Sequence, residues 1–177
     1  MAQKTVMDAE SITEAARRIA AEIIDRNSDL DKLKIIGLRS RGIHLAKRIA
    51  DEIERATEFR PSLGIVDITL YRDDLRRQTQ WPSVMKTDIP FSVEDQDIIL
   101  VDDVVYTART ARAAIEAIMD YGRPSSIQLA ALVDRGHREL PIQPDYVGIS
   151  LETSEHEKVE VHLSEMDGKD EVVVVGV

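Results

Sequence analysis

The sequence predicts an α/β fold with a mainly parallel central sheet, helices on both faces of the sheet and an antiparallel extension. Three observations support this fold class. Short apolar runs alternate with amphipathic helical patterns over most of the chain, and several β-prone runs follow one another near its end. The length of 177 residues suits one compact core. We therefore predict a single domain over residues 1–177.

The first part of the chain predicts two helices, each preceding a strand. Apolar residues at helical spacing, with Asp8 as the N-cap, predict a helix over residues 8–26. The apolar run 33–38 is typical of a buried strand, and the helical period returns over residues 43–53. Residues 63–70 then predict a second strand.

The second part begins with a long segment of mixed charge, residues 71–96, which lacks sustained periodicity. A stretch of this length is typical of a functional lid or of a disordered loop. Residues 98–101 predict a buried strand, and residues 108–120 predict a helix. Four short β-prone runs complete the chain: 127–133, 146–151, 159–163 and 172–175.

Composition excludes several classes of function. The 23 Lys and Arg residues face 33 Asp and Glu residues, so the net charge is −10 and bulk positive charge cannot hold nucleic acid or a membrane surface. Any anion site must be local. The chain has no cysteine, which rules out thiolate catalysis, disulfides and Cys-ligated zinc. No apolar run approaches the ~18–20 residues of a membrane span, so we expect no membrane partner and a cytoplasmic location.

The most informative stretch is residues 98–110, IILVDDVVYTART. A buried strand delivers Asp102 and Asp103 to its carboxyl end, where open α/β sheets bind their ligands. The following helix start offers unpaired N–H groups, two hydroxyls and an arginine, a combination that favours a phosphate. The carboxylates would repel that phosphate but suit sugar hydroxyls and Mg²⁺. The stretch predicts a sugar phosphate site, and the alternative is an acidic pair that only ends a strand.

These thirteen residues resemble the signature of the type I phosphoribosyltransferases, which binds 5-phosphoribosyl-1-pyrophosphate (PRPP). Three further strings resemble one family within them, the PyrR family of pyrimidine operon regulators and uracil phosphoribosyltransferases. These strings are DITLYRDDL (67–75), RSRGIHLAKRIA (39–50) and GRPSSIQLAALVDRGHRELP (122–141). The resemblance extends from the first predicted helix to about Val161. It implies a type I phosphoribosyltransferase fold with a flexible hood loop.

The resemblance also implies a role for particular residues. Asp102 and Asp103 would meet the ribose hydroxyls and, through water and PRPP, the shell of a Mg²⁺ cofactor. The 5′-phosphate would be held by Thr107, Ala108, Arg109 and Thr110. The pyrophosphate would be held by the loop of Arg39, Ser40, Arg41 and Gly42, in which relatives often carry a non-proline cis peptide bond. By analogy that bond would join Ser40 to Arg41.

Two more segments acquire a role in this way. The hood would begin at Asp67 and close over PRPP with Tyr71, Arg72 and Asp73, unless residues 76–90 are an ordinary loop. The base would lie against Asp134, Arg135, Tyr146 and Val147. For Tyr146 an equally good interpretation is a core aromatic at the start of a strand.

The implied reaction is the conversion of uracil and PRPP to UMP and pyrophosphate. It requires no nucleophilic side chain, because charge stabilisation and positioning can drive cleavage of the anomeric bond. The carboxylates suit an oxocarbenium-like transition state. Mg²⁺ and three arginines would offset charge on the departing pyrophosphate: Arg39, Arg41 and Arg72.

Family members also bind the leader RNA of pyrimidine genes, strengthened by uridine nucleotides, and so attenuate transcription. Candidate contacts here are Arg17, Arg18, His137 and Arg138. Glu152, Glu155 and Glu157 would repel RNA phosphates.

Three alternatives to this combined function of enzyme and regulator remain. Ala108 replaces the glycine usual in the signature, which favours a regulator with weak or no catalysis. The acidic segment 152–157 favours an enzyme that does not bind RNA. The residues that bind PRPP do not select the base. The third alternative is therefore a phosphoribosyltransferase for another base, such as hypoxanthine. From its relatives we expect a homodimer or homotetramer.

Overall fold

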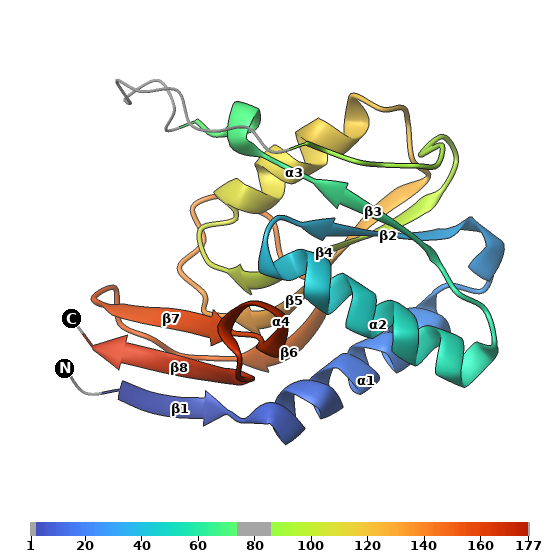
Figure 1. The fold of residues 1–177 in the computed structure, drawn as a ribbon. Helices are drawn as coiled ribbons and strands as arrows, with labels where there is room; N and C mark the ends of the chain where they lie inside the picture. The colour runs from blue at the N-terminus through green and yellow to red at the C-terminus, as the bar shows by residue number, and fades with distance from the viewer. Residues whose placement is uncertain (1–2, 74–85, 177) are drawn as a thin grey trace.

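The computed structural model describes residues 3–73 and 86–176 (Figure 1). Its elements in chain order are β1 (Gln3–Met7), α1 (Ala9–Arg26), η1 (Leu30–Lys32), β2 (Leu33–Leu38), α2 (Arg41–Thr57), β3 (Ser62–Val66), η2 (Thr69–Tyr71), β4 (Asp97–Val105), α3 (Arg109–Met119), β5 (Ser126–Asp134), β6 (Tyr146–Ser150), β7 (Glu157–His162), α4 (Ser164–Asp167) and β8 (Glu171–Gly176). Five strands form a parallel sheet in the order β3-β2-β4-β5-β6. β1, β8 and β7 form a separate antiparallel sheet.

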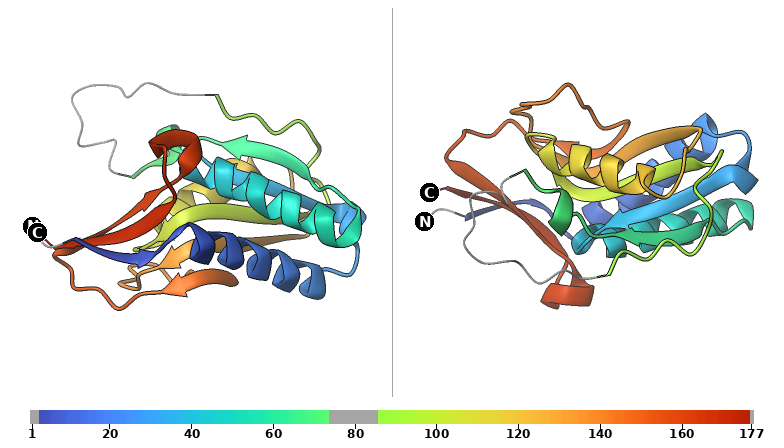
Figure 2. Two further views of the ribbon diagram at one scale, coloured as in Figure 1. Left: turned by 60° about the horizontal axis from the view of Figure 1, so that its bottom comes forward. Right: turned by 90° about the horizontal axis from the view of Figure 1, so that it is seen from above.

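Helices cover both faces of the parallel sheet. Successive side chains of a strand point to opposite faces, so Ile35 and Ile99 pack with α1 and α2, whereas Ile36 and Leu100 pack with α3. Figures 1 and 2 show α1 and α2 side by side on one face, with α3 on the other. Both strand faces are therefore buried, which explains why β2 and β4 consist of almost continuous apolar residues.

Two glycines let α2 start close to the sheet. A Cβ on Gly37 of β2 would lie 2.6 Å from the Cα of Ile43, and a Cβ on Gly42 would collide with the carbonyl oxygen of Val101 in β4. Backbone can approach backbone this closely only without a side chain. The amino end of α2 is thus held against the carboxyl ends of β2 and β4.

Most of the predicted elements are confirmed. Asp8 caps α1 as expected, because its Oδ1 accepts a hydrogen bond from the Ser11 amide at 2.8 Å. The predicted strand 63–70 is wrong after Val66. There Asp67 turns the chain, its Oδ1 accepting the amide of Thr69 at 2.9 Å, and the 3-10 turn η2 follows. In turn, β4 continues beyond the predicted 98–101 as far as Val105.

The antiparallel sheet brings the two ends of the chain together. β1, which the sequence analysis did not predict, pairs with β8 so that Gln3 lies opposite Val175. Figure 2 shows both termini at the same corner of the molecule. The short helix α4 joins β7 to β8 and lies against α2. Within residues 3–73 and 86–176, no helix combines the length and apolarity needed to cross a membrane.

Candidate active site at the carboxyl edge of the parallel sheet

The acidic pair lies near the end of β4. Asp102 is buried with only 4% of its surface exposed, and its Oδ1 accepts the amide of Asp103 at 2.9 Å. Asp103 in turn accepts the amide of Val104 at 3.0 Å. Burial raises the pKa of Asp102 well above its ordinary value, and the neighbouring Asp103 carboxylate raises it further. The pair therefore holds one carboxyl group that resists ionisation beside a more exposed one.

The loop after β4 leads directly into α3. Ala108 is the N-cap of this helix, with φ 73° and ψ 5°, the left-handed conformation that glycine adopts most readily. Its carbonyl accepts the amide of Arg112 at 3.0 Å, so the helix begins regularly despite the alanine. Because Ala108 holds the left-handed conformation, the alanine does not prevent the turn that the signature requires.

Two neighbouring cavities adjoin this segment. The larger, of about 430 Å³, is lined by the acidic pair and by side chains from three loops: Leu38, Arg39, Ser40, Asp67, Ile68, Thr69, Arg72, Asp102, Asp103, Val104 and Thr110. The smaller, of about 100 Å³, is lined by Asp102, Val104, Val105, Tyr106, Thr107, Ala108, Thr110 and Ala111. Both share Asp102, Val104 and Thr110. The structure thus unites residues that the sequence places more than sixty positions apart.

The loop between β2 and α2 forms the opposite wall of the larger cavity. Its cis peptide bond joins Arg39 to Ser40, so the position predicted from the relatives, between Ser40 and Arg41, is wrong by one residue. The sequence alone contains no signal for the choice, because neither bond precedes a proline. Arg39 donates to the carbonyl of Lys86 at 3.2 Å, and its Nε lies 4.0 Å from Oδ2 of Asp67.

Arg41 is arranged differently from Arg39. It does not line either cavity, and its guanidinium donates to Oδ1 of Asp167 at 2.9 Å. The Nε atoms of both arginines are buried, and neither has a hydrogen-bond partner among the described residues. Buried donors without a partner are costly in a folded protein. The Nε atom of Arg39, which lines the larger cavity, fits an anion as the ligand there.

The residues at the start of the predicted hood differ in what they contact. Arg72 lines the larger cavity. The hydroxyl of Tyr71 donates to Asp120 at the end of α3, and this hydrogen bond raises the pKa of Tyr71 to about 12. Asp73 accepts a hydrogen bond from Arg109 at 2.6 Å, and Glu139 binds the same guanidinium. Arg109 therefore turns away from the cavities, and residues 74–85 of the hood lie outside the described residues.

The residues predicted to hold the base do not form one cluster. Asp134 ends β5 and pairs with Arg138 at 2.8 Å, close to the carboxyl edge. Tyr146 starts β6, is 3% exposed and donates from its hydroxyl to Gln128 inside the core. The core interpretation of Tyr146 is the one that the structure fits. Its partner in that prediction, Val147, lies next to it on β6, opposite Ala131.

Sequence reasoning assigned no ligand contact to three polar residues at the cavity walls. Asp67 and Thr69 line the larger cavity, and Tyr106 lines the smaller. The guanidinium of Arg135 stacks 3.9 Å above the Tyr106 ring. Asp67 lay inside the predicted strand 63–70, and it reaches the ligand edge because β3 ends at Val66. Nothing in the sequence indicates the stacking on Tyr106.

The four candidate RNA contacts are engaged within the chain. Arg17 pairs with Glu14 at 2.6 Å, and Arg18 donates to the carbonyl of Val147 at 3.0 Å. His137 contacts the carbonyl of Thr153 at 2.6 Å, and Arg138 donates to the carbonyl of Tyr106 at 2.9 Å.

The oxygen atoms at this site suit Mg²⁺ when a phosphate ligand is bound with it. Asp102 and Asp103 supply the oxygen atoms that this cation prefers. Within residues 3–73 and 86–176, however, no group of three or more acidic or histidine side chains could hold a metal by itself. The arrangement fits an ion that takes most of its oxygens from water and from the bound phosphates.

Comparison with known proteins defines the class first. The family described as "Phosphoribosyl transferase domain" matches residues 2–177. A hypoxanthine-guanine phosphoribosyltransferase from Bacillus anthracis superposes with a TM-score of 0.73 at 13% identity, covering 98% of both chains. The hypoxanthine phosphoribosyltransferase of Trypanosoma cruzi gives 0.74 at 18% identity, covering 98% of this chain and 91% of the other. The fold class predicted from the sequence is confirmed.

Curated relatives then narrow the class. "Bifunctional protein PyrR" of Bacillus velezensis is 52% identical over 177 residues, and that of Bacillus subtilis is 51% identical, each match covering 98% of both chains. The PyrR protein of Deinococcus radiodurans is 51% identical over 166 residues, covering 94% of this chain and 91% of the relative. The chain belongs to the PyrR family of phosphoribosyltransferases. Family membership confirms the function that was predicted with it, uracil phosphoribosyltransferase and pyrimidine operon regulator.

Proposed function

We propose that the two neighbouring cavities bind PRPP and that the chain uses them to convert uracil to UMP. The observation that carries this proposal is the joint lining of one space by an acidic pair, a helix start and two arginines. The smaller cavity suits the 5′-phosphate, because Thr107 and Thr110 lie at the amino end of α3. The larger suits ribose and pyrophosphate, between Asp103 and Arg39.

The chain's own residues then have distinct tasks. Asp102 and Asp103 accept hydrogen bonds from the ribose hydroxyls, and the negative charge of the more exposed Asp103 stabilises the cationic sugar of the transition state. Arg39 and Arg72 offset the charge of the departing pyrophosphate. Mg²⁺, when bound, adds positive charge at the phosphates. Closing the cavity against water protects the anomeric carbon from hydrolysis.

For the base we propose a place beside Val104, towards Asp134 and Arg135 at the end of β5. The carboxyl ends of β4 and β5 lie at the same edge of the sheet, where Val105 is opposite Asp134. A competition assay tests the choice of base. We expect pyrophosphate release from PRPP with uracil and little or none with cytosine or hypoxanthine. Equal turnover with hypoxanthine would contradict the proposed specificity.

For regulation we propose that the chain binds a pyrimidine-gene leader RNA in the presence of UMP, through Arg17, Arg18, His137 and Arg138. Because these side chains already contact protein atoms, RNA phosphates must replace some of these contacts. We expect UMP-dependent binding that weakens steeply with added salt. Affinity no better than for a scrambled RNA would contradict this role.

We further propose that residues 1–177 act as one domain in the cytoplasm and assemble as a homodimer or homotetramer. Sedimentation at several protein concentrations measures the assembly. A constant monomer mass would contradict it.

A further inference from the structure

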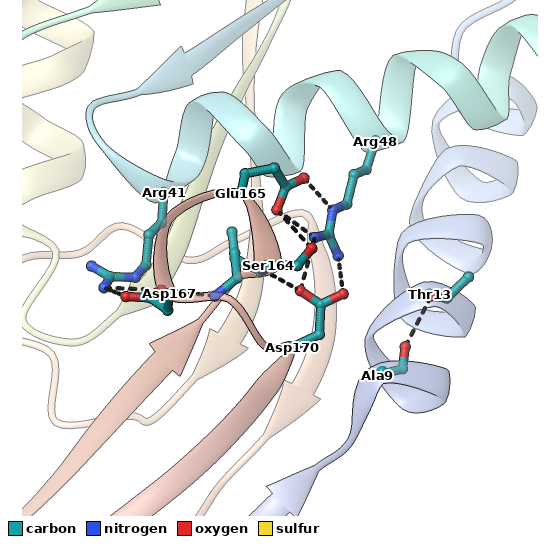
Figure 3. Close-up of polar contacts among 9 residues, drawn as sticks. Ala9, Thr13, Arg41, Arg48, Ser164, Glu165, Asp167 and Asp170 are labelled. Atoms are coloured by element: carbon teal, nitrogen blue, oxygen red, sulfur yellow. Dashed lines mark hydrogen bonds and ion pairs between the residues drawn. The ribbon is translucent and has the colours of Figure 1, made fainter.

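The C-terminal segment 164–170 lies against the side of α2 next to the pyrophosphate loop. Arg41 and Arg48 are seven residues apart on α2, which is two helical turns, so both side chains project from the same face of this helix. Figure 3 shows both guanidiniums pointing to acidic side chains of this segment. The segment therefore contacts α2 at two points along one face.

The contact further from the cavity is a fork around Arg48. Its Nη1 and Nη2 donate to the two carboxylate oxygens of Asp170 at 3.0 and 2.9 Å, and its Nε donates to Glu165 at 2.9 Å. The same carboxylate of Asp170 accepts the amide of Ser164 at 2.6 Å, so it also fixes the segment's own backbone. Bidentate arginine–carboxylate pairs with such geometry are strong and directional. This fork anchors the segment to α2.

The nearer contact joins Asp167 to Arg41. The carboxylate of Asp167 accepts Nη2 of Arg41 at 2.9 Å and the amide of Leu163 at 2.9 Å, so its orientation is set by backbone as well as by the arginine. Arg41 is the first residue of α2 and follows directly after Arg39 and Ser40, which line the larger cavity. A fixed Arg41 side chain therefore fixes the end of the loop that forms the cavity wall.

We propose that Asp167 is a positioning residue for the pyrophosphate end of the site, acting through Arg41 on the loop Arg39–Gly42; this rests on the proposed function of that loop. Asp167 lies outside the cavities and contacts no substrate. It holds a long side chain, and with it the first turn of α2, in one arrangement before PRPP arrives. Without the carboxylate, that order must be established on binding, which weakens the binding of pyrophosphate groups.

Asp167→Asn tests the proposal by separating ligands with and without a pyrophosphate. We expect the KM for PRPP and the inhibition constant of pyrophosphate to rise about five- to tenfold. The kcat with uracil and the Kd of UMP, which lacks a pyrophosphate, should stay within about twofold. Glu165→Gln is the matched control, because it weakens the Arg48 fork without touching Arg41. It should lower the unfolding temperature and leave the KM for PRPP unchanged.

The opposite results are equally clear. An unchanged or lower KM for PRPP in Asp167→Asn, or an equal loss of UMP binding, would overturn the positioning role. Asp167→Glu keeps the charge on a longer side chain, and we expect about a threefold rise in KM for PRPP. A parental KM in that variant overturns the proposal even if Asp167→Asn fails to fold. Absence of uracil turnover in the parent would instead refute the proposed function, and calorimetric titration with pyrophosphate alone would still test Asp167.

Discussion

The two loops that enclose the larger cavity are built in different ways. The segment that leads from the end of β4 into α3 is local: Asp102, Asp103 and Thr107 to Thr110 lie within nine consecutive residues, and their backbone makes many of the contacts. The loop after β2 depends on distant parts of the chain. Arg39 contacts Asp67 and Lys86, and Arg41 contacts Asp167.

This difference indicates which substitutions should affect each half of the site. In the β4–α3 loop, the chemistry resides in the residues themselves, so a substitution there should change the reaction directly. In the β2–α2 loop, the geometry depends on close backbone packing and on remote ion pairs. Substitutions far from the cavity should therefore affect that half alone.

The largest expected effect is that of Asp103→Asn, which removes one carboxylate from the local loop. Losing one electrostatic contact to the transition state costs about 3 kcal/mol, so uracil turnover should fall about a hundredfold. Steady-state kinetics with saturating PRPP measures it. Asp97→Asn, at the opposite end of the same strand, should leave turnover unchanged. Parental activity in Asp103→Asn would remove the role assigned to this carboxylate.

The next effect is that of Gly42→Ala, which probes the packing of the other loop. The added Cβ would collide with the carbonyl oxygen of Val101, so either the helix start or β4 must shift. Overpacking of this kind costs about 1–3 kcal/mol. We expect a lower unfolding temperature by calorimetry and a raised KM for PRPP. In Gly64→Ala the nearest atom is the tip of the Phe91 ring at 3.3 Å, and a clearly smaller loss is expected.

A smaller and opposite effect is expected for Ala108→Gly. The alanine holds a left-handed conformation that costs an L-residue about 1–2 kcal/mol, and glycine adopts it without that cost. Because glycine also lets a phosphate approach the backbone closely, the KM for PRPP should fall about two- to fivefold. If the KM rises instead, the Cβ of Ala108 contributes to the site. Ala113→Gly, inside α3, serves as the control and should only lower stability.

The smallest effect concerns the pH dependence of stability. Hydrogen bonds from Arg48 lower the pKa of Glu165 and of Asp170. A carboxyl whose pKa is lower in the folded chain stabilises it above the unfolded pKa of about 4, and this contribution is lost as pH falls through the folded value. The unfolding temperature should drop below about pH 4, and less so in Glu165→Gln. Since these pairs are partly exposed, the difference should stay below about 1 kcal/mol.

The fold could be predicted where a single segment carries its own signal. Buried strands such as β2 are apolar apart from Lys34, and α1 has both its helical period and its Asp8 cap. β1 could not be predicted, because only the last residue of QKTVM is buried and the segment has no apolar run of its own. It forms a strand because it pairs with β8. The same holds for α4, whose four residues are held by Arg41 and Arg48 of α2.

The site follows the same rule. In its β4–α3 half, the sequence pointed to Asp102, Thr107, Ala108 and Thr110, which line the smaller cavity, because they lie in one short stretch. It did not point to Tyr106, and Arg109 turns away from both cavities. In the β2–α2 half the residues were identified, but the position of the cis bond and the partner of Arg41 were not. The partner of Arg41 is set by tertiary packing, since Asp167 is 126 residues from Arg41 in the sequence.

The pairing of β1 with β8 imposes an order on biosynthesis. β1 is translated well before its partner β8, so the small sheet cannot form until β8 has left the ribosome. The parallel sheet, complete at β6, can fold earlier. Until β8 emerges, β1 exposes an unpaired edge. A chain truncated after residue 163 should therefore be cleaved by protease near β1 and resist it in α2.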